Sequence, residues 1–326
     1  MRPVAAAAAA AMVLICTVAA VGCGVGPGEA EEGQASLTVT RDYGTETLTT
    51  ATLDDPTPSD TVVRFLDANA EIDTEYGGNF VSTINGLEGS TVSGGPEDWF
   101  FFVNGIYSEV GAGEAEVRVG DRIWWDYRRW SEAYRVPAVV GSWPEPFLHG
   151  YDGEVRPVVV ECLAEDPAPC DEVAASLEDE GVTAEVEEVA EPVEHPDSLR
   201  ILVGAWERLS SDAAARQLEG GPGESGVYVS IESCPGDGWN LDLLASDNRP
   251  RQSLDDGGLV AAVRESDDEP TWVVTAATED DLATAAALVD AETLADRYAV
   301  AGEPGGEALP VPAPVDSPVT DPGSCR

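Results

Sequence analysis

WFFFVNGIYSEVGAGEAEVRVGDRIWWDYRRW, residues 99–130, combines the densest aromatics of this chain with its clearest strand pattern. The aromatic run at its start ends in Asn104-Gly105, a dipeptide that accepts the positive φ of a tight turn. Apolar and polar residues then alternate over Ala115–Val119 and again over Ile123–Arg128, which is the period of two expected of half-buried strands. The pattern predicts a strand, a glycine-containing loop and a terminal hairpin.

Elements that complete a small sheet precede this stretch. Leu37–Thr40 and Thr47–Leu53 form a predicted hairpin, and Phe80–Ile84 is a further short strand. Between them a helix is predicted from apolar residues at helical spacing, namely Val62, Val63, Leu66 and Ala70. This order fits a β-grasp fold, in which one helix lies across a mixed sheet.

The same residues carry a resemblance to a known family. The pattern consists of Trp99 followed by Asn104-Gly105, a glycine-containing loop, and Gly120-Asp121 before the alternating residues Ile123–Tyr127. It resembles the transcobalamin C-terminal-like β-grasp domain. That family is a domain of unknown function in bacterial surface proteins. The resemblance covers about residues 36–130, and we place the domain at residues 36–134. It is also similar to the smaller domain of the cobalamin carriers, in which the loop before the last hairpin closes over the corrin ring.

The resemblance implies a ligand site on the aromatic block and the loop Ser108–Glu114. A small planar ligand such as a corrinoid would be cargo there and not a cofactor, and a helical-barrel or transporter protein would be the partner. The implied binding residues are Trp99, Asn104, Tyr107, Val110, Gly111, Ala112, Gly113, Trp124 and Trp125. Glycines let backbone approach a ligand closely, and an exposed indole offers flat apolar area with a polar N–H.

Trp124 and Trp125 point to opposite faces of the predicted sheet, so a single helix cannot bury both. One of them is either an exposed ligand platform or is covered by the second domain or by the segment around Trp143. The loop Ser108–Glu114 can likewise be a plain surface connection.

The N-terminus predicts export and a lipid anchor. Met1-Arg2 and the apolar run after it predict a signal peptide over residues 1–22. The small residues before Cys23 resemble the lipobox of bacterial lipoproteins, which implies a lipid on Cys23 and a chain on the extracellular face of the cell membrane. An uncleaved anchor is the alternative, because the run is nearly long enough to span a bilayer. Residues 23–35 form an acidic, glycine-rich tether.

Charge narrows the class of partner. The 326 residues carry a formal charge of −45, from 62 acidic residues against 17 basic ones, and the sequence contains no Lys. So much negative charge repels nucleic acid and anionic lipid, so we expect membrane contact only through the N-terminal lipid. Five arginines fall in one segment: Arg118, Arg122, Arg128, Arg129 and Arg135. That segment either docks an acidic partner or pairs with carboxylates of its own chain.

A second domain is predicted at residues 155–301, after an ordered linker at residues 135–154. Its strands are expected at Val158–Glu161, Thr183–Val189, Leu199–Val203, Val227–Ile231, Leu241–Ala245, Leu259–Val263 and Thr271–Thr275, and its helices at Asp171–Glu180, at Asp212–Leu218 and after Thr278. This is an α/β or α+β domain, and the whole chain falls in the α+β class. Residues 302–326 are a Pro- and Gly-rich tail, expected to be loose except at Cys325.

Four cysteines remain after export, which fits an oxidising compartment. Three pairings are open in principle. Because Cys162 ends a predicted strand and Cys170 begins a predicted helix, we favour Cys162–Cys170 together with Cys234–Cys325. A zinc site is the alternative, but no C-x-x-C occurs and neither histidine lies near these cysteines in sequence, so we predict no metal site.

Catalytic patterns are missing from the sequence. His149 and His195 adjoin no nucleophile motif, and G-x-S-x-G, H-E-x-x-H and G-x-x-x-x-G-K-[ST] do not occur. We therefore predict a protein that is not an enzyme and that has neither a cofactor nor a catalytic residue. Two functions remain: a membrane-tethered extracellular ligand-binding lipoprotein of a corrinoid-type uptake system, or a non-enzymatic adhesion or scaffolding protein of the cell surface.

Overall fold

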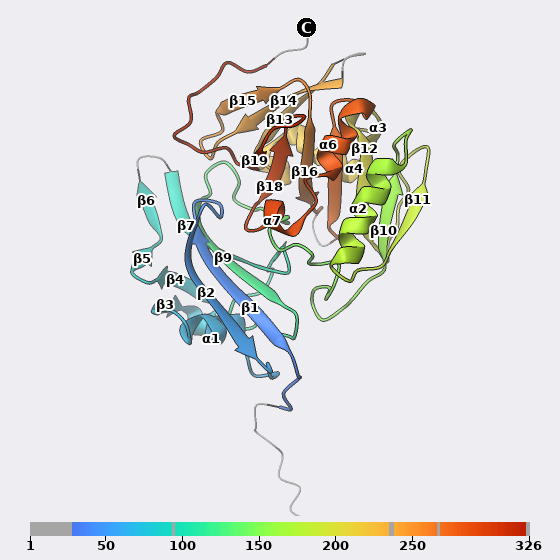
Figure 1. The fold of residues 1–326 in the computed structure, drawn as a ribbon. Helices are drawn as coiled ribbons and strands as arrows, with labels where there is room; N and C mark the ends of the chain where they lie inside the picture. Colours follow the sequence, from blue (N-terminus) through green and yellow to red (C-terminus); the bar gives the residue numbers. More distant parts are fainter. Residues whose placement is uncertain (1–27, 93–94, 235–237, 266–267, 324–326) are drawn as a thin grey trace, which may run out of the picture.

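The first unit of the chain is built on a mixed sheet with the strand order β2-β1-β9-β7-β6, beside which β8 pairs with β7 (Figure 1). The computed structural model describes residues 28–92, 95–234, 238–265 and 268–323. The strands are β1 (Gln34–Arg41), β2 (Glu46–Asp54), β6 (Ser90–Val92), β7 (Gly95–Val103), β8 (Ile106–Tyr107) and β9 (Arg122–Arg129). β9 runs parallel to β1 and antiparallel to β7, so the sheet is mixed as predicted. The strand predicted at Phe80–Ile84 is present but pairs in a separate sheet, so its place in this one was wrong.

One face of this sheet is covered by α1 (Val62–Asp67) and by a small sheet of β3 (Ile72–Glu75), β4 (Phe80–Ile84) and β5 (Leu87–Glu88), with the 3-10 turn η1 (Tyr76–Gly78) between β3 and β4. Phe65 and Leu66 of α1 share a buried cluster with Leu37 of β1 and Trp125 of β9. The helix at apolar spacing is therefore confirmed, and it covers the sheet as expected of a β-grasp.

Residues 115–119 are not a strand, and the predicted terminal hairpin is wrong. Backbone N–H groups of Val62 and Val117 donate to the carbonyls of Ala115 and Asp60, both at 2.9 Å, so the segment is bound to the start of α1. The side chains of Ala115 and Val117 are nonetheless buried in the same cluster as α1. The alternation of apolar and polar residues in this segment arises because an extended loop buries alternate side chains. It does not require pairing in a sheet.

The second unit contains a seven-stranded sheet with the order β11-β10-β12-β17-β16-β18-β19. Its strands are β10 (Val158–Cys162), β11 (Ala184–Glu188), β12 (Leu199–Ala205), β16 (Gly258–Val263), β17 (Thr271–Ala276), β18 (Ala299–Gly302) and β19 (Ala308–Val311). The four strands from β11 to β17 are parallel, and β16 is antiparallel to β17. β12, β16 and β17 are buried at almost every position, which is typical of a sheet covered on both faces.

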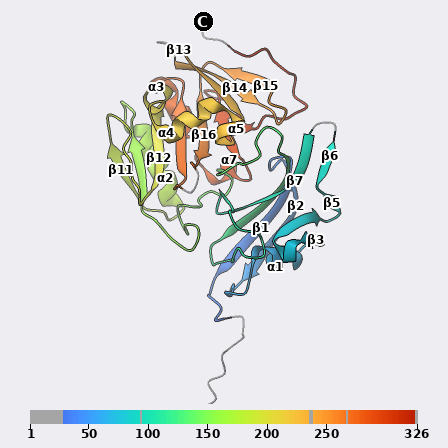
Figure 2. The ribbon, with the colours of Figure 1, turned by 180° about the vertical axis from the view of Figure 1, so that it is seen from behind.

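Layers cover both faces of that sheet. α2 (Ala168–Asp179), η3 (Glu279–Asp281), α6 (Leu282–Ala286) and α7 (Ala291–Leu294) lie on the side seen in Figure 1. The side seen in Figure 2 carries α3 (Trp206–Leu209), α4 (Ala213–Arg216), η2 (Gln217–Gly220), α5 (Pro222–Ser225) and a sheet of β13 (Val229–Cys234), β14 (Gly238–Leu244) and β15 (Pro250–Leu254). The unit has three layers, and the α+β class predicted for the chain is confirmed.

Two predictions for the second unit need correction. The helix expected over Asp212–Leu218 is divided into α4 and the 3-10 turn η2. The tail expected to be loose from residue 302 instead extends the large sheet, because β19 pairs with β18. β19 is an edge strand, so Pro310, which has no N–H to donate, is tolerated there.

The predicted Cys162–Cys170 disulfide is present, with the two Cα atoms 5.7 Å apart, and it joins the end of β10 to α2. Cys234 is also disulfide-bonded, and its predicted partner Cys325 lies outside the described residues. The signal peptide and Cys23 lie outside them as well. Among the helices of the described part, none is long and apolar enough to cross a membrane.

The two units meet across the second face of the first sheet. Trp124 and Phe102 on that face belong to one buried cluster with Tyr298 of the second unit. The ring centroid of Tyr298 lies 5.3 Å from that of Trp124 and 5.7 Å from that of Phe102. Of the two expectations for Trp124 and Trp125, cover by the second unit is the one that the structure shows.

A buried carboxylate lies at this junction. Asp126 of β9 is 0% exposed and accepts hydrogen bonds from Thr40 Oγ1 at 2.6 Å, from the backbone N–H of Tyr43 at 3.0 Å and from the Tyr298 hydroxyl at 2.9 Å. Burial raises the pKa of Asp126 to about 6, although these hydrogen bonds act in the opposite direction. The junction therefore contains a titratable group as well as an apolar core.

Candidate functional site

The tryptophans predicted to bind a ligand are core residues in this structure. Trp99, Trp124 and Trp125 are 4%, 2% and 2% exposed. Trp99 Nε1 donates to the Leu87 carbonyl at 2.9 Å, and the ring of Trp125 stacks on Phe101 with centroids 4.8 Å apart. No exposed indole is therefore offered by these three side chains.

Most of the predicted loop residues are also engaged within the fold. Asn104 is buried, and its side-chain amide donates to Asp121 Oδ1 at 2.9 Å and to the Gly150 carbonyl at 2.6 Å. Ala112 is 0% exposed. Gly111 and Gly113 lie against Asn79 so closely that a Cβ added at either would come within 2.7 Å of its side chain. These glycines permit close packing of the loop on the turn before β4.

Tyr107 and Val110 are the two predicted residues that face open space. They line a cavity of about 310 Å³, whose opposite wall is formed by Tyr151 and Arg264 of the second unit. Val110 is 48% exposed. The predicted loop thus forms one wall of a cavity between the two units, although without the expected indole.

The arginine-rich segment of the first unit is paired within the chain. The partner carboxylates are Glu116 for Arg118, Glu97 for Arg129 and Glu109 for Arg135. Arg122 donates to the carbonyl of Trp143. Arg128 lies 3.9 Å from the centroid of the Phe100 ring and donates to the Ala133 carbonyl at 2.8 Å. The expected pairing with carboxylates of the same chain is therefore present for three of the five arginines, and the other two donate to backbone carbonyls.

A larger cavity, of about 790 Å³, opens in the second unit where β12 and β17 begin and β16 ends. The loop of residues 191–196 and the start of α4 complete its wall. Its charged lining residues are Glu191, Glu194, His195, Arg200, Asp212, Arg264, Glu265, Asp268 and Glu269. Cavities of this volume accommodate small-molecule ligands.

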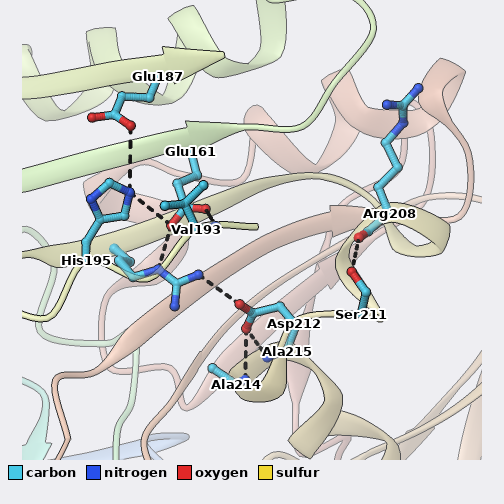
Figure 3. Close-up of polar contacts among 10 residues, drawn as sticks. Glu161, Glu187, Val193, His195, Arg208, Ser211, Asp212, Ala214 and Ala215 are labelled. Atoms are coloured by element: carbon cyan, nitrogen blue, oxygen red, sulfur yellow. Dashed lines mark hydrogen bonds and ion pairs between the residues drawn. The ribbon is translucent and has the colours of Figure 1, made fainter. Parts of the chain in front are cut away.

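A buried carboxylate organises one end of this cavity (Figure 3). Glu161 of β10 is 0% exposed and accepts hydrogen bonds from the Val193 backbone N–H at 2.9 Å and from Arg200 Nε at 2.6 Å. His195 Nε2 lies 3.6 Å from Glu161 Oε1 and 3.7 Å from Glu187 Oε2, and it has no hydrogen-bond partner. Glu161 thereby fixes the loop that carries His195 against the sheet.

The same chain of contacts continues to the helix α4. Arg200 Nη2 donates to Asp212 Oδ2 at 2.9 Å. The other oxygen of Asp212 accepts the backbone N–H groups of Ala214 and Ala215 at 2.8 and 3.1 Å, which is an N-cap (Figure 3). Burial lowers the pKa of Arg200, but its bonds to Asp212 and Glu161 outweigh this and raise the pKa overall. Arg200 is a charged, fully paired residue.

Arg264 lies between the two cavities and lines both. Beside it, the Tyr151 hydroxyl donates to Glu269, and Arg156 Nε lies 2.7 Å from the other oxygen of Glu269. The Arg264 guanidinium carbon is 5.6 Å from the centroid of the Tyr151 ring. Burial and the bond to Glu269 raise the pKa of Tyr151, so this hydroxyl stays protonated near neutral pH.

The polar side chains of the two cavities can recognise a ligand through charge and hydrogen bonds. In the described ranges no group of three or more His, Cys, Asp or Glu side chains could hold a metal ion. The arginines of the two cavities, Arg118, Arg200 and Arg264, are charge carriers and hydrogen-bond donors. The arrangement can therefore bind and orient a polar ligand.

The larger cavity was not predicted from the sequence. Its residues come from four separate segments, so no local pattern brings them together. One signal was present: Glu161 stands within the apolar run Val158–Cys162. A charged residue inside a buried strand requires a partner, and that partner, Arg200, leads to the cavity.

The similarity of this chain to a known family covers part of the first unit. Residues 59–129 match a family model described as "Domain of unknown function (DUF4430)". No curated protein matches the chain. Among solved structures, the chain is similar to a "putative metal binding protein" from Ruminococcus gnavus ATCC 29149, at 15% identity over 30% of this chain and 98% of that chain, with a TM-score of 0.24. A similarity at that TM-score supports no conclusion about the ligand.

Proposed function

We propose that this protein is a lipid-anchored extracellular binding protein, and that its small-molecule site is the pair of cavities beside Arg264. The observation that carries this proposal is that cavities of about 790 and 310 Å³ share one buried arginine at the junction of the two units. Binding sites for small molecules typically lie in cavities of about 300–1,000 Å³ and are common between domains.

The tether is supported by the sequence. Cys23 follows an apolar signal peptide, and residues 23–35 are acidic and rich in glycine. Because β1 begins at Gln34 and the backbone N–H of Glu31 donates to the Pro56 carbonyl at 3.0 Å, residues 23–30 remain for the tether. Eight residues in extended conformation would reach on the order of 25 Å, which is enough to hold a folded protein clear of a membrane surface. An extracellular location also agrees with the disulfide between Cys162 and Cys170.

A corrinoid is the specific ligand that the resemblance implies, with a helical-barrel or transporter protein as partner. Because Trp124 and Trp125 are both buried, a corrinoid would have to contact Tyr107 and Val110 at the smaller cavity. We therefore propose a small polar ligand as the general class and treat a corrinoid as one candidate within the test. An adhesion or scaffolding role is the outcome if the cavities bind nothing.

The proposal is tested by blocking the larger cavity without disturbing the fold. Ala213 is an exposed residue at the start of α4 and lines this cavity, so Ala213→Trp places an indole in its mouth. Ala283 is also exposed, on α6, and lines neither cavity, which makes Ala283→Trp the matched control. Full-length protein is extracted in detergent, and the small molecules that remain bound are released by denaturation and identified by mass spectrometry.

We expect the wild type and Ala283→Trp to retain the same small molecule and Ala213→Trp to lose it. Equal content in all three proteins would refute a cavity site and leave the scaffolding role. Titration of the wild type with cobinamide, followed by tryptophan fluorescence, tests the corrinoid candidate separately, and no saturable change would exclude it.

A further inference from the structure

Four arginines of the described part of the chain are almost entirely buried or lie in the wall of the larger cavity, and they differ in how their charge is neutralised. Arg251 is 7% exposed and pairs with Asp247 at 2.8 Å. Arg128 is 1% exposed, its terminal nitrogens donate to the backbone carbonyls of Ala133 and Tyr134, and its guanidinium lies over the face of Phe100, while its Nε has no partner among the described residues. Arg200 is held by two carboxylates, Glu161 and Asp212. Burial of a cation without such partners is costly, so an exception needs an explanation.

Arg264 is that exception. It is only 9% exposed, and its Nε donates to the backbone carbonyl of Asp268 at 2.6 Å. Within the described ranges no ion pair neutralises it, because the nearby Glu269 is already engaged by Arg156 and by the Tyr151 hydroxyl. Among the described residues the terminal nitrogens of Arg264 have no hydrogen-bond partner, and the side chain lines both cavities. Its two-pronged donor edge is therefore available to an acceptor in the cavity.

The mouth of the larger cavity carries the opposite charge. Glu191, Glu194, Glu265 and Asp268 line it, and all four residues are exposed. In a chain of formal charge −45, a ligand that is only an anion would be repelled before it reached Arg264. A ligand that is only a cation would be attracted to the mouth and would leave the inner guanidinium unpaired.

We infer that the ligand of the larger cavity is a small zwitterion, whose carboxylate pairs with Arg264 and whose cationic end faces the carboxylates of the mouth. This inference rests on the proposed function and adds the chemical class of the ligand. An arginine guanidinium recognises a carboxylate through two parallel hydrogen bonds, which a lysine ammonium cannot reproduce. Arg264 would then set the orientation of the ligand, with the cationic end outward.

Three probes separate the two charges of such a ligand. L-arginine carries a carboxylate and cationic groups, agmatine is the same molecule without the carboxylate, and glutarate has carboxylates without a cation. Each is titrated by calorimetry at low ionic strength into full-length protein in detergent. The proteins compared are the wild type, Arg264→Gln, Arg264→Lys and, as a control, Arg216→Gln, which removes an exposed arginine of α4 that lines neither cavity.

In the wild type we expect L-arginine to bind at least tenfold more tightly than agmatine, and glutarate to bind more weakly than either. Arg264→Gln should abolish the preference for L-arginine over agmatine, Arg264→Lys should restore part of it, and Arg216→Gln should leave it unchanged. Circular dichroism of Arg264→Gln and Arg264→Lys checks that both fold.

Equal affinity for L-arginine and agmatine, or an unchanged preference in Arg264→Gln, would overturn the inference. Failure of all three probes overturns it as well. In that case the proposed function still stands if the co-purified small molecule depends on Ala213, and falls with it if that molecule is also absent.

Discussion

Buried polar side chains differ in their hydrogen bonding between two regions of this chain, the sheet face of β9 and the wall of the larger cavity. On β9, Trp124 and Asp126 are buried, and their polar atoms are satisfied: Trp124 Nε1 donates to Thr40 Oγ1 at 2.8 Å, and Asp126 accepts four side-chain or backbone donors. At the cavity, Arg264 is almost as buried, but its terminal nitrogens have no acceptor among the described residues. The concentration of aromatics forms a core, whereas Arg264 is the residue on which we base the proposed ligand site.

The largest effect that tests this contrast is the removal of Trp124. Trp124→Ala should lower the free energy of unfolding by about 3–5 kcal/mol, because it leaves a cavity in the core shared by the two units. Urea unfolding followed by circular dichroism measures the change. Trp130 is only partly buried, so Trp130→Ala is the matched control and should cost about 1 kcal/mol or less. Equal losses in the two variants would mean that the Trp124 face is not a core.

The next largest effect is the loss of stability expected when the disulfide of the second unit is removed. No cysteine occurs in residues 24–161, whereas the second unit contains the Cys162–Cys170 disulfide, which closes a loop of eight residues in sequence separation. Replacing both cysteines with alanine should destabilise the second unit by about 2–3 kcal/mol on the chain-entropy estimate. Hydrogen exchange resolved by peptide should show faster exchange in β10 and α2 and unchanged exchange in β1 and β2. Equal acceleration in β1 and β2 would show that the two units unfold as one.

The smallest effect is a pH dependence located at the junction. Burial raises the pKa of Asp126 to about 6 in the folded state, above the ordinary value of 3.8 that applies in the unfolded chain. The folded state therefore binds more protons between these two values, so stability should increase as the pH falls through about 6 and level off below about 4. The expected gain between about pH 7 and pH 5 is on the order of 1 kcal/mol.

Asp126→Asn supplies the reference for that measurement, because it removes the titration from the junction. Burial raises the pKa of Asp121 to about 6 as well, so the difference between the wild type and Asp126→Asn isolates the contribution of Asp126. Parallel stability curves for the two proteins between about pH 7 and pH 5 would contradict the raised pKa.

Much of the fold could be predicted from local patterns, and the failures have a physical cause. The strands β1, β2, β10 and β12 and the helix α1 follow directly from apolar periodicity. Residues 115–119 have the same alternation but pair with the start of α1, since periodicity records which side chains are buried and not what the backbone bonds to. The tail could not be placed either, because β19 depends on β18 as its partner and not on its own composition.

The candidate site was less accessible to sequence reasoning. Tyr107 and Val110 were expected beside a ligand, and they do line the smaller cavity. Arg264 could not be singled out, because its unpaired state depends on Glu269 being occupied by Arg156 and Tyr151 from distant parts of the chain. An arginine without a carboxylate partner can be recognised only from a structure that shows which residues surround it.

The contacts of Tyr43 at the junction also bear on the order in which this chain folds during synthesis. Tyr43 shares a hydroxyl–hydroxyl contact of 2.8 Å with Tyr228, and its ring centroid lies 5.0 Å from that of Tyr298. Because a chain is synthesised from its N-terminus, the β9 face stays uncovered until Tyr298 has also been made. During that interval the rings of Phe102 and Trp124 are accessible to chaperones and proteases, so the last strands of the second unit determine when the first unit becomes resistant to them.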